Sequence, residues 1–149
     1  MHRNRNKTIL IINGPNLNML GVREPHIYGR ETLDDIHALC EAEAATHDMV
    51  CDFRQSNHEG EIVTWIQQER ENIAGLIINA GAYTHTSVAI HDALKLLDVP
   101  VIEVHLSDPE KREAFRHLSY ITPVAATVIK GKGAQGYPEA IQSLIARIF

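Results

Sequence analysis

The sequence lacks the features that mark several large classes of protein. Its uninterrupted apolar runs are no more than five residues long, whereas a membrane-spanning helix needs roughly 20, so we expect no membrane segment. The net charge is −5 at pH 7 with neutral histidines, which gives no support for a nucleic-acid or anionic-membrane partner. With 149 residues, 44% hydrophobic and 22% charged, the chain has the composition of one ordinary globular domain.

Cysteine and cofactor-binding patterns are also scarce. The two cysteines, Cys40 and Cys51, are too few for a disulfide framework or a cysteine-rich zinc site. We therefore expect free thiols and a cytoplasmic location. The sequence contains no HExxH, CxxC or paired-histidine pattern, and no GxGxxG fingerprint or P-loop follows the first apolar run. We expect neither a metal ion nor any other cofactor.

Short apolar or β-branched runs recur along the chain and predict five strands: Thr8–Ile12, Val50–Phe53, Leu76–Ile78, Val101–Val104 and Ala125–Ile129. The first, third and fourth are almost wholly apolar, as in strands buried on both faces of a parallel sheet. Amphipathic segments between and after them predict five helices: Thr32–Thr46, Ser56–Ile73, Ser87–Leu97, Asp108–Leu118 and Pro138–Phe149.

This alternation predicts an α/β fold: a single flavodoxin-like doubly wound domain, with a five-stranded parallel sheet and helices on both faces. We expect it to span residues 8–149, after a flexible polar tail over residues 1–7, which no apolar segment of signal-peptide length follows. The segment Asn13–Arg30 makes the first strand–helix connection much longer than the others. Long loops beyond the carboxyl ends of parallel strands are commonly functional.

Polar side chains gather just beyond three of the expected strands. They are Asn16, Arg23 and Tyr28 in the long loop, Asn79 and His85 after the third strand, and Glu103, His105, Ser107, Arg112 and Arg116 at and beyond the fourth. Since the carboxyl ends of parallel strands share one edge of the sheet, we expect these groups to converge. Amides, imidazoles, guanidiniums and a phenol suit a small polyhydroxylated anion and acid–base chemistry.

Taken singly, these residues also have structural explanations. Asn16 fits an Asx turn, Tyr28 fits packing within the loop, and Arg23 fits a solvated surface charge. The case for chemistry is stronger at His105, because Glu103 two residues earlier faces the same side of the strand. A neighbouring carboxylate fixes the imidazole tautomer and favours its protonated form, but a structural pair remains an alternative.

Three other functions compete with acid–base catalysis. Lys130 and Lys132 follow the last expected strand, where a Schiff-base lysine is conceivable, although nothing nearby in the sequence is arranged to desolvate them. A flavodoxin-like module would bind flavin or phosphate, but that function calls for a Ser/Thr/Gly-rich first loop. A catalytically inactive sensor of small hydroxylated acids is the third alternative.

Five blocks of the sequence occur together, in this order and at this spacing, in one known family. The blocks are Asn13–Asn18 with Gly21–Gly29, Gln55–Gly60, Ile78–Ser87, Ile102–Ser107 with Arg112 and Arg116, and Gly133–Tyr137. The chain therefore resembles the type II 3-dehydroquinate dehydratases from about Ile9 to Tyr137. The resemblance implies a lyase that converts 3-dehydroquinate to 3-dehydroshikimate through an enolate, without a cofactor, in the shikimate pathway or in quinate catabolism.

The resemblance also implies a role for each catalytic residue. Tyr28 matches the base that removes the C2 proton; since free phenols titrate near about 10, a base of this kind needs a neighbouring cation, for which Arg23 is the candidate. Asn16 matches the residue that holds a water against the enolate oxygen. His105 matches the acid that protonates the departing C1 hydroxyl, oriented by Glu103.

Further matches concern substrate binding and assembly. The expected substrate contacts are Asn79, His85, Leu106, Ser107 and Arg116, with Asp92 supplied by a neighbouring subunit. A Ser107 amide beside the start of a helix suits the substrate carboxylate. Members of the family assemble as trimers packed into dodecamers, so the resemblance implies a large homo-oligomer.

Overall fold

The computed structural model describes residues 7–22 and 24–149. Its centre is one five-stranded parallel sheet with the strand order β2-β1-β3-β4-β5. The strands are β1 (Thr8–Asn13), β2 (Val50–Gln55), β3 (Gly75–Asn79), β4 (Val101–Val104) and β5 (Thr127–Ile129). Each lies within two residues of its predicted position, and the order confirms the flavodoxin-like fold.

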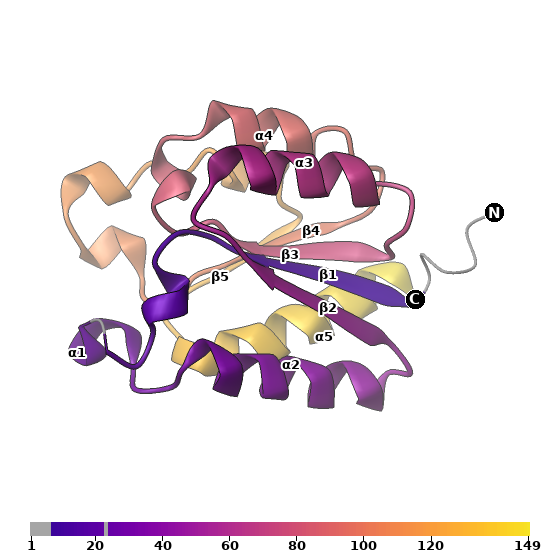
Figure 1. Cartoon of the computed structure of the whole chain (residues 1–149), viewed down its shortest axis with the longest axis horizontal. Coiled ribbons are helices and arrows are strands. Elements are labelled where there is room, and N and C mark those ends of the chain that lie inside the picture. The colour runs from indigo at the N-terminus through magenta and orange to yellow at the C-terminus, as the bar shows by residue number, and fades with distance from the viewer. Residues whose placement is uncertain (1–6, 23) are drawn as a thin grey trace.

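Two layers of helices cover the sheet. The helices are α1 (Pro25–Tyr28), α2 (Leu33–Thr46), α3 (Glu59–Glu69), α4 (Val88–Leu94) and α5 (Gly136–Ile148). Helices α2 and α5 pack on one face and α3 and α4 on the other (Figure 1). The central strands alternate between these layers, since Ile9 and Ile11 join one core and Leu10 and Ile12 the other.

Capping contacts account for where three of the helices begin. Thr32 and Asp35 form a reciprocal capping box at the start of α2, and Ser87 accepts a hydrogen bond from the Ile90 backbone N–H at α4. Ser56 instead accepts from the His58 backbone N–H in the preceding turn, so α3 begins three residues later than predicted. Helices α3 and α4 also end before their predicted limits.

The helix predicted over Asp108–Leu118 is wrong. This segment forms two separate 3-10 turns, Pro109–Lys111 and Ala114–Arg116. Asp108 does cap the first turn, but Arg112 then adopts an extended backbone that ends it. The apolar side chains that a helix would bury here stay exposed, Phe115 at 67% and Leu118 at 56%. A short helix with no buried face gains too little from packing to persist.

Five of these 3-10 turns and the short helix α1 lie around the carboxyl ends of the strands. The remaining turns there are Leu17–Met19, Gly81–His85 and Gly133–Gln135. In Figure 1 α1 stands at this end, on the left, well away from the start of β1. The described part of the long connection after β1 therefore lies at the edge of the sheet where ligands bind.

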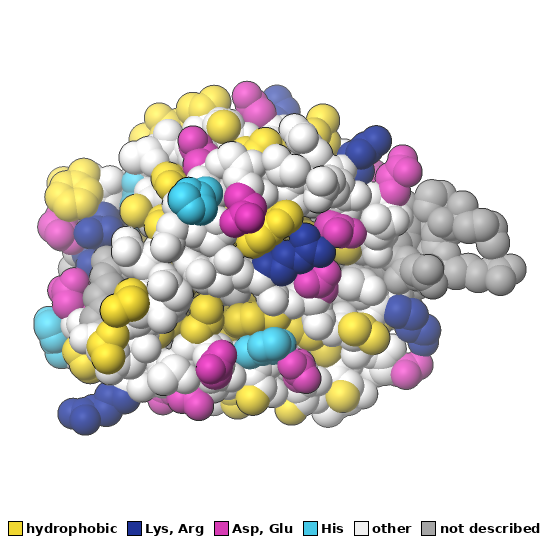
Figure 2. All heavy atoms as spheres, viewed as in Figure 1, with side chains coloured by type: hydrophobic (Ala, Val, Ile, Leu, Met, Phe, Trp, Pro, Cys, Tyr) yellow, Lys and Arg dark blue, Asp and Glu magenta, His cyan; other side chains and the backbone are white. Residues whose placement is uncertain are grey.

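Only the last residue of the predicted tail lies within the described part of the chain. Residues 1–6 of the predicted tail lie outside the described residues, as does Arg23, whereas the Lys7 side chain is paired with Asp48 at 2.7 Å. In Figure 2 acidic and basic side chains are interspersed over the described part of the visible face, without a continuous basic area. No helix within residues 7–22 and 24–149 is long and apolar enough to cross a membrane.

Candidate active site

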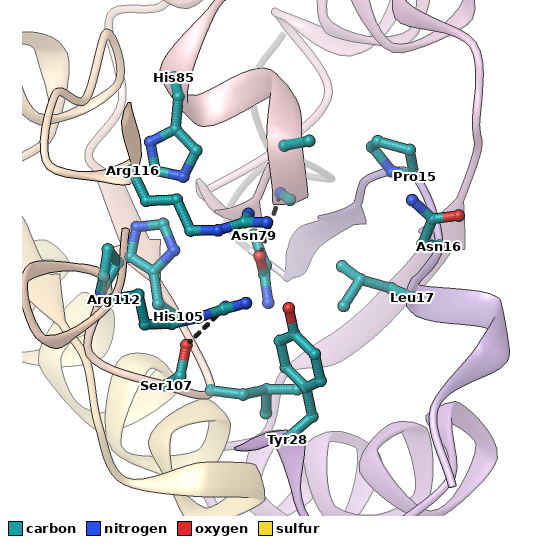
Figure 3. Close-up of a pocket in the computed structure, with 14 residues that line it drawn as sticks. Pro15, Asn16, Leu17, Tyr28, Asn79, His85, His105, Ser107, Arg112 and Arg116 are labelled. Carbon is teal, nitrogen blue, oxygen red and sulfur yellow. Dashed lines mark hydrogen bonds between the residues drawn. The ribbon is translucent and has the colours of Figure 1, made fainter. Parts of the chain in front are cut away.

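A cleft opens at the carboxyl edge of the sheet, between the loops that follow β1, β3 and β4 (Figure 3). The space between its atoms amounts to about 520 Å³, its open mouth included, which is within the usual range for small-molecule sites. The expected residues that line it are Asn16, Tyr28, Asn79, His85, His105, Leu106, Ser107, Arg112 and Arg116. The convergence predicted from the strand ends is therefore what the fold produces.

Two described residues among those expected are not on the wall of this cleft, and a third is not described. Glu103 lies behind His105, against its imidazole. Asp92 is exposed on α4 and does not reach the cleft of its own chain. Arg23, the expected cation beside the phenol, lies outside the described residues.

The His105–Glu103 pair forms a tight and almost fully buried contact. Nε2 of His105 is 2.5 Å from Oε2 of Glu103, and the two residues are 8% and 1% exposed. Glu103 lies in β4 and His105 directly follows its end, so the two residues are two positions apart and both groups lie on one side of the sheet, as predicted. With Nε2 held by the carboxylate, Nδ1 is the imidazole nitrogen that remains for a ligand.

Two hydroxyl groups complete the surroundings of Glu103, and no sequence pattern pointed to either of them. Ser119 donates to Oε2 at 2.9 Å and Thr122 donates to Oε1 at 2.6 Å. Burial alone raises the pKa of Glu103, but the hydrogen bonds from His105, Thr122 and Ser119 outweigh it and hold that pKa below its ordinary value. The carboxylate therefore remains charged beside the imidazole.

Tyr28 reaches the cleft from the last turn of α1. The helix begins with Pro25 and ends at Gly29, whose φ of 88° turns the chain sharply. The ring is 8% exposed, and its hydroxyl points toward the middle of the cleft in Figure 3. The guanidinium of Arg112 lies over the ring, 5.0 Å from its centroid. Arg112 is thus the cation that the described residues place beside the phenol.

The loop after β4 is fixed by the loop after β5. The backbone N–H of Gly131 donates to the Ser107 carbonyl at 3.1 Å, and that of Gly133 donates to the Leu106 carbonyl at 3.0 Å. Both glycines have positive φ, 75° and 59°. The expected helix start beside Ser107 is absent, since only a three-residue 3-10 turn follows, so an anion here would meet backbone amides and Arg112 rather than a helix terminus.

Asn79, at the end of β3, is held in one orientation by two hydrogen bonds. Its Oδ1 accepts from the Gly81 backbone N–H at 3.2 Å, and its Nδ2 donates to the Tyr137 hydroxyl at 3.1 Å. An amide nitrogen carries two protons. The second one is therefore available to a ligand in the cleft, and Asn79 presents a donor there rather than an acceptor.

The loop after β1 closes against the loop after β3. A side chain at Gly14 would lie 2.3 Å from the Ala80 carbonyl oxygen, so only glycine fits this crossing. Asn16 follows in a left-handed conformation, with φ 70° and ψ −5°. This conformation brings Asn16 to the cleft wall opposite His105 in Figure 3.

A backbone carbonyl fixes the orientation of the His85 ring. Nδ1 of His85 lies 2.7 Å from the Leu118 carbonyl oxygen, and burial lowers the pKa of His85 despite this contact. The neutral ring then presents Nε2 to the cleft.

Lys130 pairs with Glu110 and Lys132 pairs with Glu139. Paired ammonium groups do not suit a Schiff-base nucleophile, which must lose its proton.

The cleft can bind a small anion rich in hydroxyl groups. Its described lining carries two arginines, two histidines and two amides, without a carboxylate. Among the described residues no group of three or more potential metal-binding side chains comes together. A phenol and a carboxylate-supported imidazole in one cleft form a pair suited to moving protons at two carbon centres of one substrate.

Comparisons with known proteins point to one family. The family model described as Dehydroquinase class II matches residues 7–145. The chain is 56% identical to 3-dehydroquinate dehydratase of Brucella canis over 94% of this chain and 89% of the relative. It is 54% identical to 3-dehydroquinate dehydratase of Hyphomonas neptunium, over 93% of each. The crystal structure of type II dehydroquinase from Butyrivibrio crossotus superposes with a TM-score of 0.91 at 44% identity, covering 94% of this chain and 98% of the other.

Proposed function

This chain belongs to the class II dehydroquinase family, and from that membership we infer that it is a 3-dehydroquinate dehydratase of the shikimate pathway. The reaction removes one proton from C2 and the hydroxyl group from C1 of 3-dehydroquinate. The products are water and an enone, 3-dehydroshikimate. The observation that supports this assignment best is the single cleft into which Tyr28 and the His105–Glu103 pair both reach.

We propose that Tyr28 is the base and His105 the acid. The phenolate takes the C2 proton, and the electron pair moves into an enolate on the C3 oxygen. As the enolate collapses, the C1–O bond breaks and Nδ1 of His105 delivers a proton, so the hydroxyl leaves as water. Transfer of one proton from Tyr28 back to His105, through solvent, restores both groups. Glu103 stabilises the protonated imidazole throughout.

The remaining groups bind the substrate and stabilise charge. Arg112, which lies over the Tyr28 ring, and Arg23, from the same loop as Tyr28, are the cations assigned to stabilise charge that develops in the reaction. Asn16 holds a water against the enolate oxygen. Arg112 also donates to the Ser107 hydroxyl at 3.4 Å, so backbone amides of Leu106 and Ser107 and this guanidinium form the carboxylate subsite. Asn79, His85 and Arg116 contact the substrate hydroxyl groups.

The activity and the base assignment are tested by ultraviolet absorbance. The enone product is conjugated and the substrate is not, so adding 3-dehydroquinate to purified protein should raise the absorbance, in the presence of a chelator as well. Tyr28→Phe should lower kcat by roughly 10²- to 10⁴-fold, as expected for loss of a general base, while calorimetry still detects substrate binding. Tyr120→Phe is the matched control.

Two results would contradict this proposal. Near-normal turnover by Tyr28→Phe would show that another group is the base. No absorbance change with folded wild-type protein, combined with substrate binding, would identify a sensor of hydroxylated acids instead.

We also propose that the chain works as a homo-oligomer, a dodecamer built of trimers, in the cytoplasm. Asp92 is exposed on α4 and away from its own cleft, which fits a role in the cleft of a neighbouring subunit. The free thiols of Cys40 and Cys51 fit a reducing compartment. Light scattering gives the assembled mass. Mixing subunits of Asp92→Ala with subunits of Tyr28→Phe should restore part of the activity, because some clefts then receive both intact residues.

A further inference from the structure

Asn57, in the turn between β2 and α3, contacts two loops of the cleft although it does not line the cleft itself. Its Oδ1 accepts a hydrogen bond from the Asn16 backbone N–H at 3.0 Å. Its backbone carbonyl accepts another from the Tyr83 hydroxyl at 2.8 Å. Tyr83 belongs to the 3-10 turn after β3. Asn57 therefore connects the loops that follow β1, β2 and β3.

The contact with Asn16 falls on a strained position. Asn16 has a φ of 70°, a left-handed conformation that costs a residue other than glycine free energy and persists only when its surroundings impose it. Asparagine tolerates this region better than most residues. The backbone N–H of Asn16 points to Asn57, and its carbonyl accepts from the Met19 N–H at 3.0 Å. The two bonds fix the peptide groups on both sides of the Asn16 side chain.

Gln55 reinforces the same contact from the end of β2. Its Nε2 lies 3.1 Å from Oδ1 of Asn57 and 3.1 Å from the Gly14 carbonyl oxygen. It also lies 3.4 Å from Oδ1 of Asn18. Oδ1 of Asn57 thus has two donors, which leave it little freedom to move away from Asn16. Among the described residues, the Asn57 side chain makes no hydrogen bond other than those with the Asn16 backbone and the Gln55 side chain.

We propose that Asn57 is a positioning residue for the dehydration: its Oδ1 holds Asn16 in the left-handed conformation that turns the Asn16 amide toward the water it holds against the enolate oxygen. This inference rests on the role proposed above for Asn16. Without the bond, Asn16 relaxes toward ordinary φ values and its amide leaves the position that the enolate requires. The ground-state substrate does not depend on this contact, so the effect falls on kcat more than on KM.

The test compares Asn57→Leu, which removes the acceptor at similar size, with Asn57→Asp, which retains it. Asn57→Leu should lower kcat by about 10- to 100-fold, less than the full loss of an oxyanion-stabilising donor, and leave KM within about threefold. Asn57→Asp should retain kcat within about threefold of wild type, because a carboxylate accepts the same bonds. Asn72→Leu, at an exposed asparagine near the opposite end of α3, is the matched control and should be unchanged.

A double-mutant cycle separates positioning from general loosening of the fold. If Asn57 acts through Asn16, Asn57→Leu should have almost no further effect on kcat in an Asn16→Ala background. An equal loss in both backgrounds, or an unchanged kcat for Asn57→Leu in wild type, would overturn the inference while leaving the Asn16 assignment intact. Full activity of Asn16→Ala would overturn both. The inference would also be contradicted if Asn57→Asp lost as much activity as Asn57→Leu, because the hydrogen-bond acceptor at residue 57 would then have no role.

Discussion

The side-chain amide of Asn79 donates a 3.1 Å hydrogen bond to the hydroxyl of Tyr137, across 58 residues of the chain. The same hydroxyl donates to Oδ1 of Asn13 at 2.7 Å. Tyr137 is fully buried at the start of α5, and burial raises its pKa, so it remains a neutral donor. One hydroxyl group therefore joins the ends of β1 and β3 and orients the amide that Asn79 presents to the cleft.

Removing this hydroxyl should affect both stability and substrate binding. Tyr137→Phe leaves the polar atoms of Asn13 and Asn79 buried without their shared partner, which should cost about 1–3 kcal/mol of the free energy of unfolding. Because Asn79 is then free to turn, KM should rise several-fold. Guanidinium denaturation and steady-state kinetics measure the two effects. Tyr120→Phe, at a half-buried tyrosine, should change neither. Unchanged KM in Tyr137→Phe would show that Asn79 needs no help to hold its orientation.

The lowered pKa of Glu103 predicts how stability depends on pH. A carboxyl group whose pKa is lower in the folded than in the unfolded protein stabilises the fold above the unfolded pKa. That contribution is lost as the pH falls below the ordinary value of 4.5 and through the folded pKa. Wild-type protein should lose melting temperature steadily in this acid range. Glu103→Gln should be less stable at neutral pH and should decline less in acid. A parallel decline in both proteins would contradict the prediction, and Glu61→Gln is the control for an exposed carboxylate.

Two threonines near Glu103, Thr84 buried and Thr122 exposed, should respond in opposite ways to the same substitution. Thr84 is fully buried, and its Oγ1 has no hydrogen-bond partner among the described residues. Thr84→Val should leave the free energy of unfolding unchanged or raise it by up to about 1 kcal/mol, because valine removes an unpaired polar group without changing the shape. Thr122→Val removes a donor to a charged carboxylate and should cost roughly 1.5–3 kcal/mol. Thermal and chemical denaturation of the two variants gives the comparison, and a large loss in Thr84→Val would contradict it.

The ion pairs of the two lysines predict that no imine forms during turnover. Hydrogen bonding to Glu110 raises the pKa of Lys130, and Lys132 is 2.6 Å from Glu139. Lys130 therefore stays protonated and unreactive toward a ketone, and Lys132 is engaged with a carboxylate rather than free to attack one. Borohydride added together with 3-dehydroquinate should leave the enzyme active and its mass unchanged. Irreversible inactivation with a substrate-derived mass on Lys130 or Lys132 would replace the enolate mechanism with a Schiff base.

The cleft was predictable from the sequence because its residues follow apolar runs. Asn79 ends one buried strand and His105 directly follows another, and the carboxyl ends of parallel strands meet at one edge whatever the details of packing. The absence of a helix over Asp108–Leu118 was not predictable in the same way. Its start signals, Asp108 and Pro109, are present, but a helix also needs a buried face, and local sequence does not reveal whether a neighbouring element supplies one.

The sequence by itself determined the order of strands and helices, the edge of the sheet that carries the site, and the contact between Glu103 and His105. These features depend on hydrophobic periodicity and on residues two positions apart, both of which are local. Only the tertiary structure decided that Tyr137 orients Asn79, that Asn57 holds Asn16, and that Ser119 and Thr122 complete the surroundings of Glu103. Each of these bonds joins separate elements, and a hydroxyl or amide in a sequence can pair with any group that folding brings within about 3 Å.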